Sequence, residues 1–221
     1  EVVQRPASCI KELVENALDA GATHIRIIVR DGGRTLLQVV DNGKGMSATD
    51  VRMAFERHAT SKISQASDLF QLRTMGFRGE ALASICAVAQ VDVNTRRPDD
   101  EVGTHLEIAG SEVIAQEVTQ CPAGTNIRVK NLFYNVPARR KFLKTATTEG
   151  GYIADLCEHL AMSKPSVSFR FIVNNQVKFH TSGNGDIREI IYRIFGKEFI
   201  KEMLPIDFRE EGIHMQGFLG K

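Results

Sequence analysis

One feature of the 221-residue sequence limits the possible fold most strongly: a repeat typical of a helix is followed by runs typical of β-strands. A helical repeat comes first, opened by Arg5-Pro6 and ended at Gly21, because proline suits the first helical position and glycine suits a helix end. The apolar positions of this repeat are Ile10, Leu13, Val14, Ala17 and Leu18. Two strand-like runs follow at 23–31 and 35–41, and the Gly32-Gly33 pair between them predicts a hairpin.

Strand-like runs outnumber helical ones in the rest of the chain. Ser47 and Asp50 form a capping box, which predicts a short helix through residue 55. Further strands are expected at 90–96, 103–109, 112–119, 125–130, 168–174 and 176–181, and further helices at 80–87, from 137, at 151–164 and at 186–195. Because strands and helices do not alternate strictly, the sequence predicts an α+β fold, with helices on one face of a largely antiparallel sheet.

The stretch Ser182-Gly183-Asn184-Gly185 is small, polar and rich in glycine, as linkers are. We therefore expect one domain over 1–182. Residues 183–221 are expected to hold the linker and the truncated start of a second domain. The chain begins with Glu1 instead of methionine and stops at Lys221 just after a strand-like run, so both ends are interpreted as cuts.

Composition narrows the possible functions. The 28 Lys and Arg residues nearly balance the 27 Asp and Glu residues, so a nucleic-acid or membrane contact would need a local patch. No apolar run approaches the roughly 20 residues of a membrane span, and no signal peptide is expected. The cysteines have no metal-ligand spacing and are expected to be reduced, buried thiols of a cytosolic protein. They are Cys9, Cys86, Cys121 and Cys157.

The first helix carries a polar stripe. Glu12, Asn16 and Asp19 share one side of the helix, opposite the apolar positions. A solvated acidic face is one interpretation. In the other, Glu12 is a general base for a water molecule, and the amide oxygen of Asn16 ligates a hard cation such as Mg²⁺. The spacing alone leaves both interpretations open.

Asp41-Asn42-Gly43-Lys44-Gly45 follows the apolar run 36–40. Asn-Gly is a common turn signal, so a tight turn is expected here in any case. The carboxylate at the end of the run could also accept a hydrogen bond from an exocyclic amine such as that of adenine, and two glycines let the backbone approach a ligand closely. These residues alone do not decide between a plain turn and a nucleotide-binding loop.

Residues 56–79 show no sustained periodicity, and we interpret this long connection as a mobile lid. Its segment His58-Ala59-Thr60-Ser61-Lys62 suits phosphate contacts, although ordinary polar loop composition explains it equally well. Gly76-Phe77-Arg78-Gly79-Glu80 then precedes a helix start, where free amides and the helix dipole favour an anion. A loop-to-helix junction with incidental glycines is the alternative.

Two further patterns admit a structural and a functional interpretation. Thr125 follows Gly124 at the start of a strand, where a β-branched residue is common for structural reasons alone. A basic cluster follows Pro137 and would form either a solvated helix end or a contact to a phosphate backbone. It consists of Arg139, Arg140, Lys141 and Lys144.

The order of these motifs resembles the GHKL superfamily of ATPases. Glu-x-x-x-Asn lies on the first helix, Asp-x-Gly-x-Gly follows a strand, a glycine-bearing lid comes next, and Gly-Thr begins a late strand. Within that superfamily, four strings look like the MutL family of DNA mismatch-repair proteins. They are ELVENALDAGA at 12–22, HATSK at 58–62, GFRGEAL at 76–82 and PARRKFL at 137–143.

The resemblance implies a Bergerat sandwich that binds ATP and Mg²⁺. It makes Glu12 the general base, Asn16 the magnesium ligand and Asp41 the residue that reads adenine. It further implies Gly43, Gly45 and Met46 at the base and ribose, Thr60, Ser61 and Lys62 in the lid, Gly76, Phe77, Arg78 and Gly79 at the triphosphate, and Thr125 as support for adenine through water.

The resemblance also implies the cellular role. In this family ATP orders the lid and drives pairing of the ATPase heads, as a homodimer or a heterodimer of paralogues. Implied partners are a MutS-type mismatch-recognition protein, nicking or unwinding enzymes, and DNA bound non-specifically; the implied location is a bacterial cytoplasm, or the nucleus of a eukaryote. Residues 183–221 resemble the start of a second domain like domain 2 of ribosomal protein S5.

Two family features are missing from the chain. The family's N-terminal arm would precede Glu1, and the second-domain lysine that approaches the γ-phosphate would follow Lys221. Weak turnover and poor dimerisation are therefore expected. Two alternatives remain at this point: a nucleotide-gated interaction module in which hydrolysis is incidental, or another GHKL branch such as a sensor kinase or a type II topoisomerase subunit.

Overall fold

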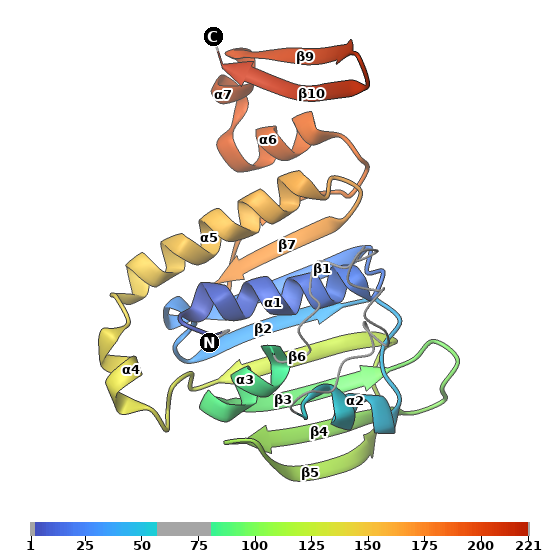
Figure 1. Cartoon of the computed structure of the whole chain (residues 1–221), viewed down its shortest axis with the longest axis vertical. Coiled ribbons are helices and arrows are strands. Elements are labelled where there is room, and N and C mark those ends of the chain that lie inside the picture. The colour runs from blue at the N-terminus through green and yellow to red at the C-terminus, as the bar shows by residue number, and fades with distance from the viewer. Residues whose placement is uncertain (1–2, 57–80, 221) are drawn as a thin grey trace.

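One eight-stranded sheet organises the fold. The computed structural model of the protein describes residues 3–56 and 81–220. The strands lie in the order β5-β4-β3-β6-β2-β1-β7-β8, and all neighbours are antiparallel except β1 and β7 (Figure 1). They are β1 His24–Arg30, β2 Leu36–Asp41, β3 Gln90–Arg96, β4 Gly103–Ala109, β5 Glu112–Thr119, β6 Gly124–Lys130, β7 Ser168–Val173 and β8 Gln176–His180. The α+β prediction is confirmed.

Helices α1, α3 and α5 lie on one face of this sheet (Figure 1). The elements after β8 lie beyond the edge of the sheet that β8 forms. There β9 and β10 pair with each other in a separate two-stranded sheet. The bounds are α1 Pro6–Asp19, α2 Ala48–Ala54, α3 Ala81–Val88, α4 Pro137–Phe142, α5 Ala146–Ser163, α6 Ile187–Phe195, α7 Lys197–Lys201, β9 Met203–Glu210 and β10 Ile213–Gly220, with a 3-10 turn at Asp31–Gly33. No helix of the described residues is long and apolar enough to cross a membrane.

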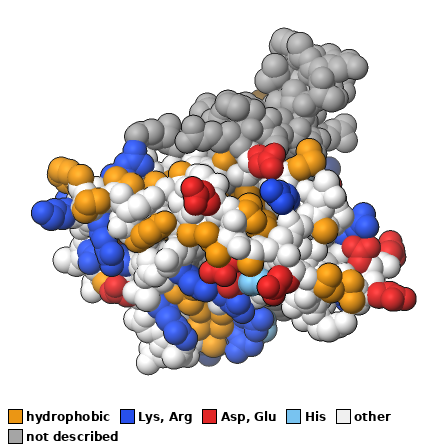
Figure 2. Space-filling model, turned by 90° about the horizontal axis from the view of Figure 1, so that it is seen from below, with side chains coloured by type: hydrophobic (Ala, Val, Ile, Leu, Met, Phe, Trp, Pro, Cys, Tyr) orange, Lys and Arg blue, Asp and Glu red, His pale blue; other side chains and the backbone are white. Residues whose placement is uncertain are grey.

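Alternation along the strands explains why helices cover only one face. In β1, Ile25, Ile27 and Val29 are buried, whereas Arg26 and Arg30 at the alternate positions are exposed. Successive side chains of a strand point to opposite faces, so the apolar set lies beneath the helices and the arginines lie on the open face. Viewed from below in Figure 1, Lys and Arg side chains gather on both sides of a narrow hydrophobic strip (Figure 2).

Local signals set most element bounds as predicted. Ser47 Oγ accepts from the Asp50 N–H at 3.1 Å, and this capping box opens α2. The hairpin of β7 and β8 turns at Asn174 and Asn175, which both have positive φ. Asparagine tolerates the left-handed region better than most residues, so the two adjacent asparagines predict this turn.

The predicted start of the long helix at residue 151 is wrong, because α5 begins at Ala146. Thr145 Oγ1 accepts from the Thr148 N–H at 3.2 Å and caps the helix, which begins five residues before the predicted start. Gly150-Gly151 then lies inside the second turn. Each interior glycine costs only about 1 kcal/mol relative to alanine, which a strong cap and a packed face can outweigh.

The four cysteines are free thiols, and three of them are buried. Cys9, Cys86 and Cys157 are buried as expected, but the expectation is wrong for Cys121, which is partly exposed. Burial raises the pKa of the Cys9 thiol and of the Cys86 thiol to about 12. The reactive form of cysteine is the thiolate, so neither thiol is a nucleophile at neutral pH.

Candidate functional site

Helix α1 carries the predicted polar stripe in a partly buried setting. Glu12, Asn16 and Asp19 are each partly buried, and 22% of the Glu12 side chain is exposed, so the stripe is not a fully solvated face. Lys11 Nζ lies 4.0 Å from Glu12 Oε1. The same Nζ lies 3.1 Å from Oε1 of Glu15, a buried acid that sequence analysis does not single out.

The loop after β2 packs against the C-terminal end of α1. The Lys44 N–H donates to the Ala20 carbonyl at 3.0 Å, and a Cβ on Gly43 would lie 2.8 Å from Ala20 Cβ. Ala20 follows Asn16 by one turn, since its N–H donates to the Asn16 carbonyl at 2.9 Å. Each turn of a helix rises about 5.4 Å, so Glu12, Asn16 and the contact of this loop with Ala20 follow one another along α1, one turn apart.

Strand β3 holds the same loop from the other side. Gly45 has a φ of +64°, and a Cβ there would lie 2.1 Å from the carbonyl oxygen of Arg96. The Met46 N–H donates to Thr95 Oγ1 at 3.0 Å. The loop is thus fixed between α1 and β3, which explains the second glycine that a plain turn leaves unexplained.

Thr95 connects several of the predicted residues, although sequence analysis does not single it out. Its side chain is fully buried, and Oγ1 lies 3.1 Å from Thr125 Oγ1 and donates to the Gly124 carbonyl at 3.1 Å. Val91 and Val93 precede it at the inward positions of β3. A hydroxyl at the next inward position is the one sequence signal that could have identified it.

Asp41 ends β2 directly opposite Thr125 of β6. Its Oδ1 accepts from the Gly43 N–H at 2.8 Å, and the Thr125 N–H also donates to the carboxylate. Burial raises the pKa of Asp41, and the two donors only partly offset that effect. The carboxylate is therefore short of solvation and suited to a further N–H donor.

Asn42 and Gly124 fix the position of Asp41. Asn42 Oδ1 accepts from the Thr23 N–H and the His24 N–H, both at 2.9 Å, and so ties the start of β1 to the end of β2. Gly124 has a φ of +111°, and a Cβ there would lie 2.1 Å from the Asp41 carbonyl oxygen. Asn42 thus has a structural role, and Gly124 leaves room for the backbone of Asp41.

Asn16 is the residue that sequence analysis predicts as a magnesium ligand. Across residues 3–56 and 81–220, no group of three or more His, Cys, Asp or Glu side chains is placed to hold a metal ion. Mg²⁺ is often bound by one or two side chains, with substrate phosphates and water completing its coordination. One amide oxygen from Asn16 fits that mode, and its role as the ligand stays a prediction.

The remaining predicted contacts lie outside the described residues. They are Thr60, Ser61, Lys62, Gly76, Phe77, Arg78 and Gly79, together with all of the expected lid except residue 56. Their roles at the phosphates stay predictions.

The basic cluster lies on α4 and just after it. Arg140, Lys141 and Lys144 are exposed and Arg139 is partly buried, while Phe142 between them is 85% exposed. The structure brings this cluster together as a surface, and its contact with DNA stays a prediction.

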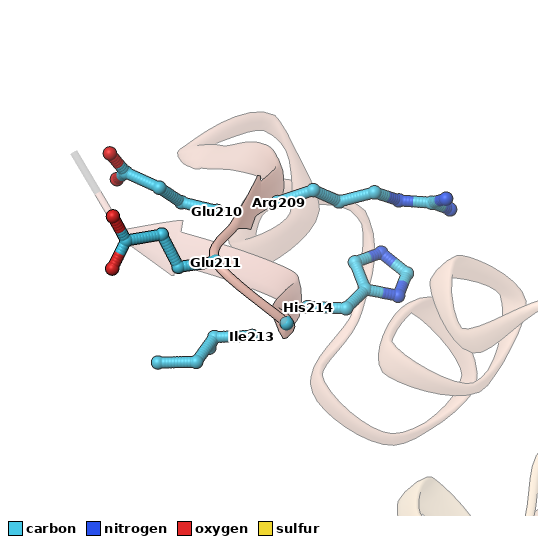
Figure 3. A pocket seen from close by; sticks show the side chains of 6 residues that line it. Arg209, Glu210, Glu211, Ile213 and His214 are labelled. Atoms are coloured by element: carbon cyan, nitrogen blue, oxygen red, sulfur yellow. The ribbon is translucent and has the colours of Figure 1, made fainter.

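Two hollows of the surface lie away from the residues above. One, of about 380 Å³, lies between β8 and α6. The other, of about 330 Å³, lies at the turn from β9 to β10, where Glu210 and Glu211 point to one side and Arg209 and His214 to the other (Figure 3). In a binding site, polar groups converge on the ligand. The side chains at the turn from β9 to β10 point away from one another, so they do not form such a site.

Comparison with protein families agrees with the geometry. Residues 4–131 match the family model described as "Histidine kinase-, DNA gyrase B-, and HSP90-like ATPase". The whole chain is 52% identical to the DNA mismatch repair protein MutL of Agathobacter rectalis and 53% identical to that of Phocaeicola vulgatus. It covers 34% and 35% of these two proteins, so the chain spans about a third of the length of the curated relatives it matches.

Solved structures show the same fold. The Aquifex aeolicus MutL ATPase domain complexed with ADP superposes with a TM-score of 0.74 at 25% identity, over 94% of this chain and 73% of that one. A crystal structure of the N-terminal domain of a DNA repair protein superposes with a TM-score of 0.82 at 25% identity, over 98% of this chain and 68% of that one.

Proposed function

Because the chain belongs to the histidine kinase-, DNA gyrase B- and HSP90-like ATPase family, in its MutL branch, we propose that it is the ATPase head of a mismatch-repair protein. It binds ATP with Mg²⁺ and hydrolyses the nucleotide slowly. The observation that carries this proposal is the loop from Asp41 to Met46, which is fixed between the end of α1 and the end of β3. That loop joins the proposed adenine reader to the helix of the proposed base.

Adenine recognition is assigned to Asp41. Its carboxylate has two backbone donors and is still poorly solvated, which suits it to accept from the exocyclic amine of adenine. Gly43 and Gly45 let the loop pack closely against Ala20 and against the Arg96 carbonyl, which fixes the backbone that would lie beside the base and ribose. Thr125, tied to Thr95, supports the far side of the base through water.

Hydrolysis is assigned to Glu12. Its partly buried carboxylate lies on α1 one turn before Asn16, and it would accept a proton from the attacking water. Asn16 would hold Mg²⁺ through its amide oxygen, and the bound ion would neutralise charge on the phosphates. Residues on one rigid helix keep their spacing during the reaction, which favours positioning of the water and the phosphate.

The proposal extends to parts of the chain that rest on family resemblance. Residues 60–62 and 76–79 would contact the phosphates, and ATP would order the surrounding lid and pair two ATPase heads. The paired heads would signal between a mismatch-recognition protein and the enzymes that excise the strand. Residues 1–182 would form the ATPase domain, and 183–221 the linker and the start of the next domain.

Glu12→Ala and Asp41→Asn separate turnover from binding. Glu12→Ala is expected to keep ATP affinity and to lower turnover by about 10²- to 10⁴-fold, the usual contribution of a general base. Asp41→Asn keeps one acceptor oxygen for the Gly43 N–H and replaces the other carboxylate oxygen by an NH2 donor, which would face the adenine amine. Losing a hydrogen bond to a charged group, worth about 1.5–3 kcal/mol, weakens binding roughly 10- to 100-fold.

The measurements are phosphate release and the affinity for a fluorescent ATP analogue. Glu15→Gln is the matched control, because it removes a neighbouring acid of the same helix that has no proposed role in the reaction. Unchanged turnover in Glu12→Ala would refute the assignment of the base. A Glu12 variant that does not turn over but still pairs and recruits partners on ATP would show that hydrolysis is incidental to the switch.

A further inference from the structure

Strand β5 forms one edge of the eight-stranded sheet, at the bottom of Figure 1. Within the described part of the chain β5 pairs with β4 alone, so the backbone groups on its other side have no neighbouring strand. Natural proteins usually keep edge strands short or place lysine or proline on them, because unpaired N–H and C=O groups invite another strand. β5 has eight residues, more than any other described strand of this sheet, and neither lysine nor proline. This edge is therefore open to a further strand.

The opposite edge of the sheet is protected by contrast. β8 has only five residues, with Lys178 at its centre. Helix α6 also packs against it. A short strand, a lysine and a covering helix are recognised ways to prevent the addition of a strand. Of the two edges, β5 is the one that can accept another strand.

Apolar side chains of β5 lie exposed on the side of the sheet that the helices cover elsewhere. Val113 lies opposite Ile108 and Val118 lies opposite Thr104, and both of these β4 residues are buried. Directly opposite residues share a face of the sheet. Val113 is nonetheless 41% exposed, and Val118 is 75% exposed. A strand added next to β5 would cover both valines.

The other side of β5 is acidic. Glu112 and Glu117 are exposed there, and Glu107 of β4 is exposed on the same side. Neither β4 nor β5 contains lysine or arginine. Figure 2 looks onto this edge from below, where Asp and Glu side chains lie beside hydrophobic ones. The negative charge of this side favours a partner that carries cations.

β5 is held in place before any partner binds. Its register with β4 is regular from Ala115 to Thr119, and its irregularity lies at Ile114, which has no partner in this register. Gln116 Nε2 donates to the Ala48 carbonyl at 2.9 Å, which ties the strand to the start of α2. A preformed strand loses little conformational entropy on binding. The cost of ordering therefore falls mainly on the partner segment.

The two sides of β5 together specify what would fit. Side chains of an added strand alternate between the two sides, so every second one would lie beside the valines and the others beside the glutamates. Opposite charges that face each other across strands are favourable, and like charges are unfavourable. A segment in which Val, Ile or Leu alternates with Lys or Arg therefore fits this edge. A second copy of β5 does not, because it would bring glutamates against glutamates.

We propose that β5 binds an extended segment of a partner protein as a further strand of the sheet, a segment whose apolar residues alternate with lysine or arginine. Backbone hydrogen bonds would supply affinity, and the alternation of side chains would supply specificity. The proposal goes beyond the proposed function, because none of the residues assigned to ATP lies on β4 or β5. It therefore stands or falls separately from the ATPase assignment.

The test is fluorescence anisotropy of a labelled octapeptide of alternating valine and lysine, titrated with the 221-residue chain. The peptide has the length of β5. Glu112→Lys/Glu117→Lys turns two favourable charge pairs into unfavourable ones, so it should weaken binding of this peptide roughly tenfold. The same variant should prefer an octapeptide of alternating valine and glutamate, and the unmodified chain should show the opposite preference.

Two controls separate strand addition from general attraction. Glu210→Lys/Glu211→Lys makes the same change in charge at the turn from β9 to β10 and should bind the Val-Lys peptide like the unmodified chain. A peptide with the same side chains but N-methylated backbone nitrogens cannot donate to a strand, so it should bind roughly tenfold more weakly. Thermal unfolding of each variant checks that it is folded.

Four results of the peptide titrations would overturn the proposal. They are no binding of the Val-Lys peptide at millimolar concentration, unchanged binding by folded Glu112→Lys/Glu117→Lys, an equal loss in Glu210→Lys/Glu211→Lys, and equal binding of the N-methylated peptide. Analytical ultracentrifugation of the chain tests the remaining occupant. Dimers that Val118→Lys abolishes would show that the edge pairs with a second copy of this chain, and would also overturn the proposal.

Discussion

Replacing Thr95 by valine removes one hydroxyl from the centre of the candidate site and keeps the shape of the side chain. That hydroxyl accepts from the Met46 N–H at 3.0 Å and donates to the Gly124 carbonyl at 3.1 Å. It also lies 3.1 Å from Thr125 Oγ1, which is then free to donate to it. One buried atom therefore joins the loop after β2 to the start of β6.

The expected loss follows from the groups left without a partner. A buried donor without an acceptor costs about 1–3 kcal/mol, and the Met46 N–H would become such a donor. The Thr125 hydroxyl can rotate, and the Gly124 carbonyl loses one of its acceptor contacts, so these groups add less. We expect a total near 2 kcal/mol, which for a domain of this size lowers Tm by about 4–8 °C. Part of this free energy would have to be supplied when ATP binds and orders the loop. Since 1.4 kcal/mol corresponds to a factor of ten in affinity, ATP affinity should fall roughly tenfold.

Thermal unfolding and ATP-analogue binding measure both effects. Thr95→Ser is the matched control, because it keeps the hydroxyl and removes one methyl group, at about 0.8–1 kcal/mol of stability. Serine should bind ATP like the unmodified chain, and valine should not. If valine bound ATP normally and melted no lower than serine, the hydroxyl would have no role in holding the loop, and the reasoning would be refuted.

Two other substitutions test the same loop. Burial raises the pKa of Asp41, so the folded chain holds more protons than the unfolded chain between the ordinary and the raised pKa, and stability from this group falls as pH rises through that window. Asp41→Asn should therefore raise the Tm of the nucleotide-free protein at pH 7 while weakening ATP binding; a lower Tm at pH 7 would contradict the burial argument. Gly45→Ala forces a Cβ to within 2.1 Å of backbone, whereas Gly21→Ala at φ +74° meets nothing within 4 Å. In urea unfolding, Gly21→Ala should lower the free energy of unfolding by only about 1–2 kcal/mol, the strain of a side chain at positive φ. Gly45→Ala should lower it clearly more. Equal losses would show that the loop can move away from β3.

Much of the fold was predictable because its signals are local. The capping box at Ser47 and Asp50 and the turn at Asn174-Asn175 depend on residues a few positions apart, and both occur where predicted. The error at the start of α5 has the same origin. Gly150-Gly151 is a strong local signal for a helix boundary, which is why the start was predicted at 151. The cap at Thr145 instead starts the helix at Ala146.

The candidate site was only half predictable. Helical spacing placed Glu12 and Asn16 on one side of α1, since 3.6 residues per turn holds in any helix. It could not show that Ala20, one turn later, meets Lys44 and Gly43, because that contact depends on how α1 packs over β2.

By itself, the sequence determined the elements, the polar stripe on α1 and the order of motifs that led to the family. Tertiary structure alone decided that Thr95 joins the loop after β2 to β6, because strands β3, β2 and β6 become neighbours only in the assembled sheet. It also decided that Arg26 and Arg170, 144 positions apart in the chain, stand side by side on the open face. Net charge sums over the whole chain, whereas a partner meets one surface, and sheet pairing determines which charges share it.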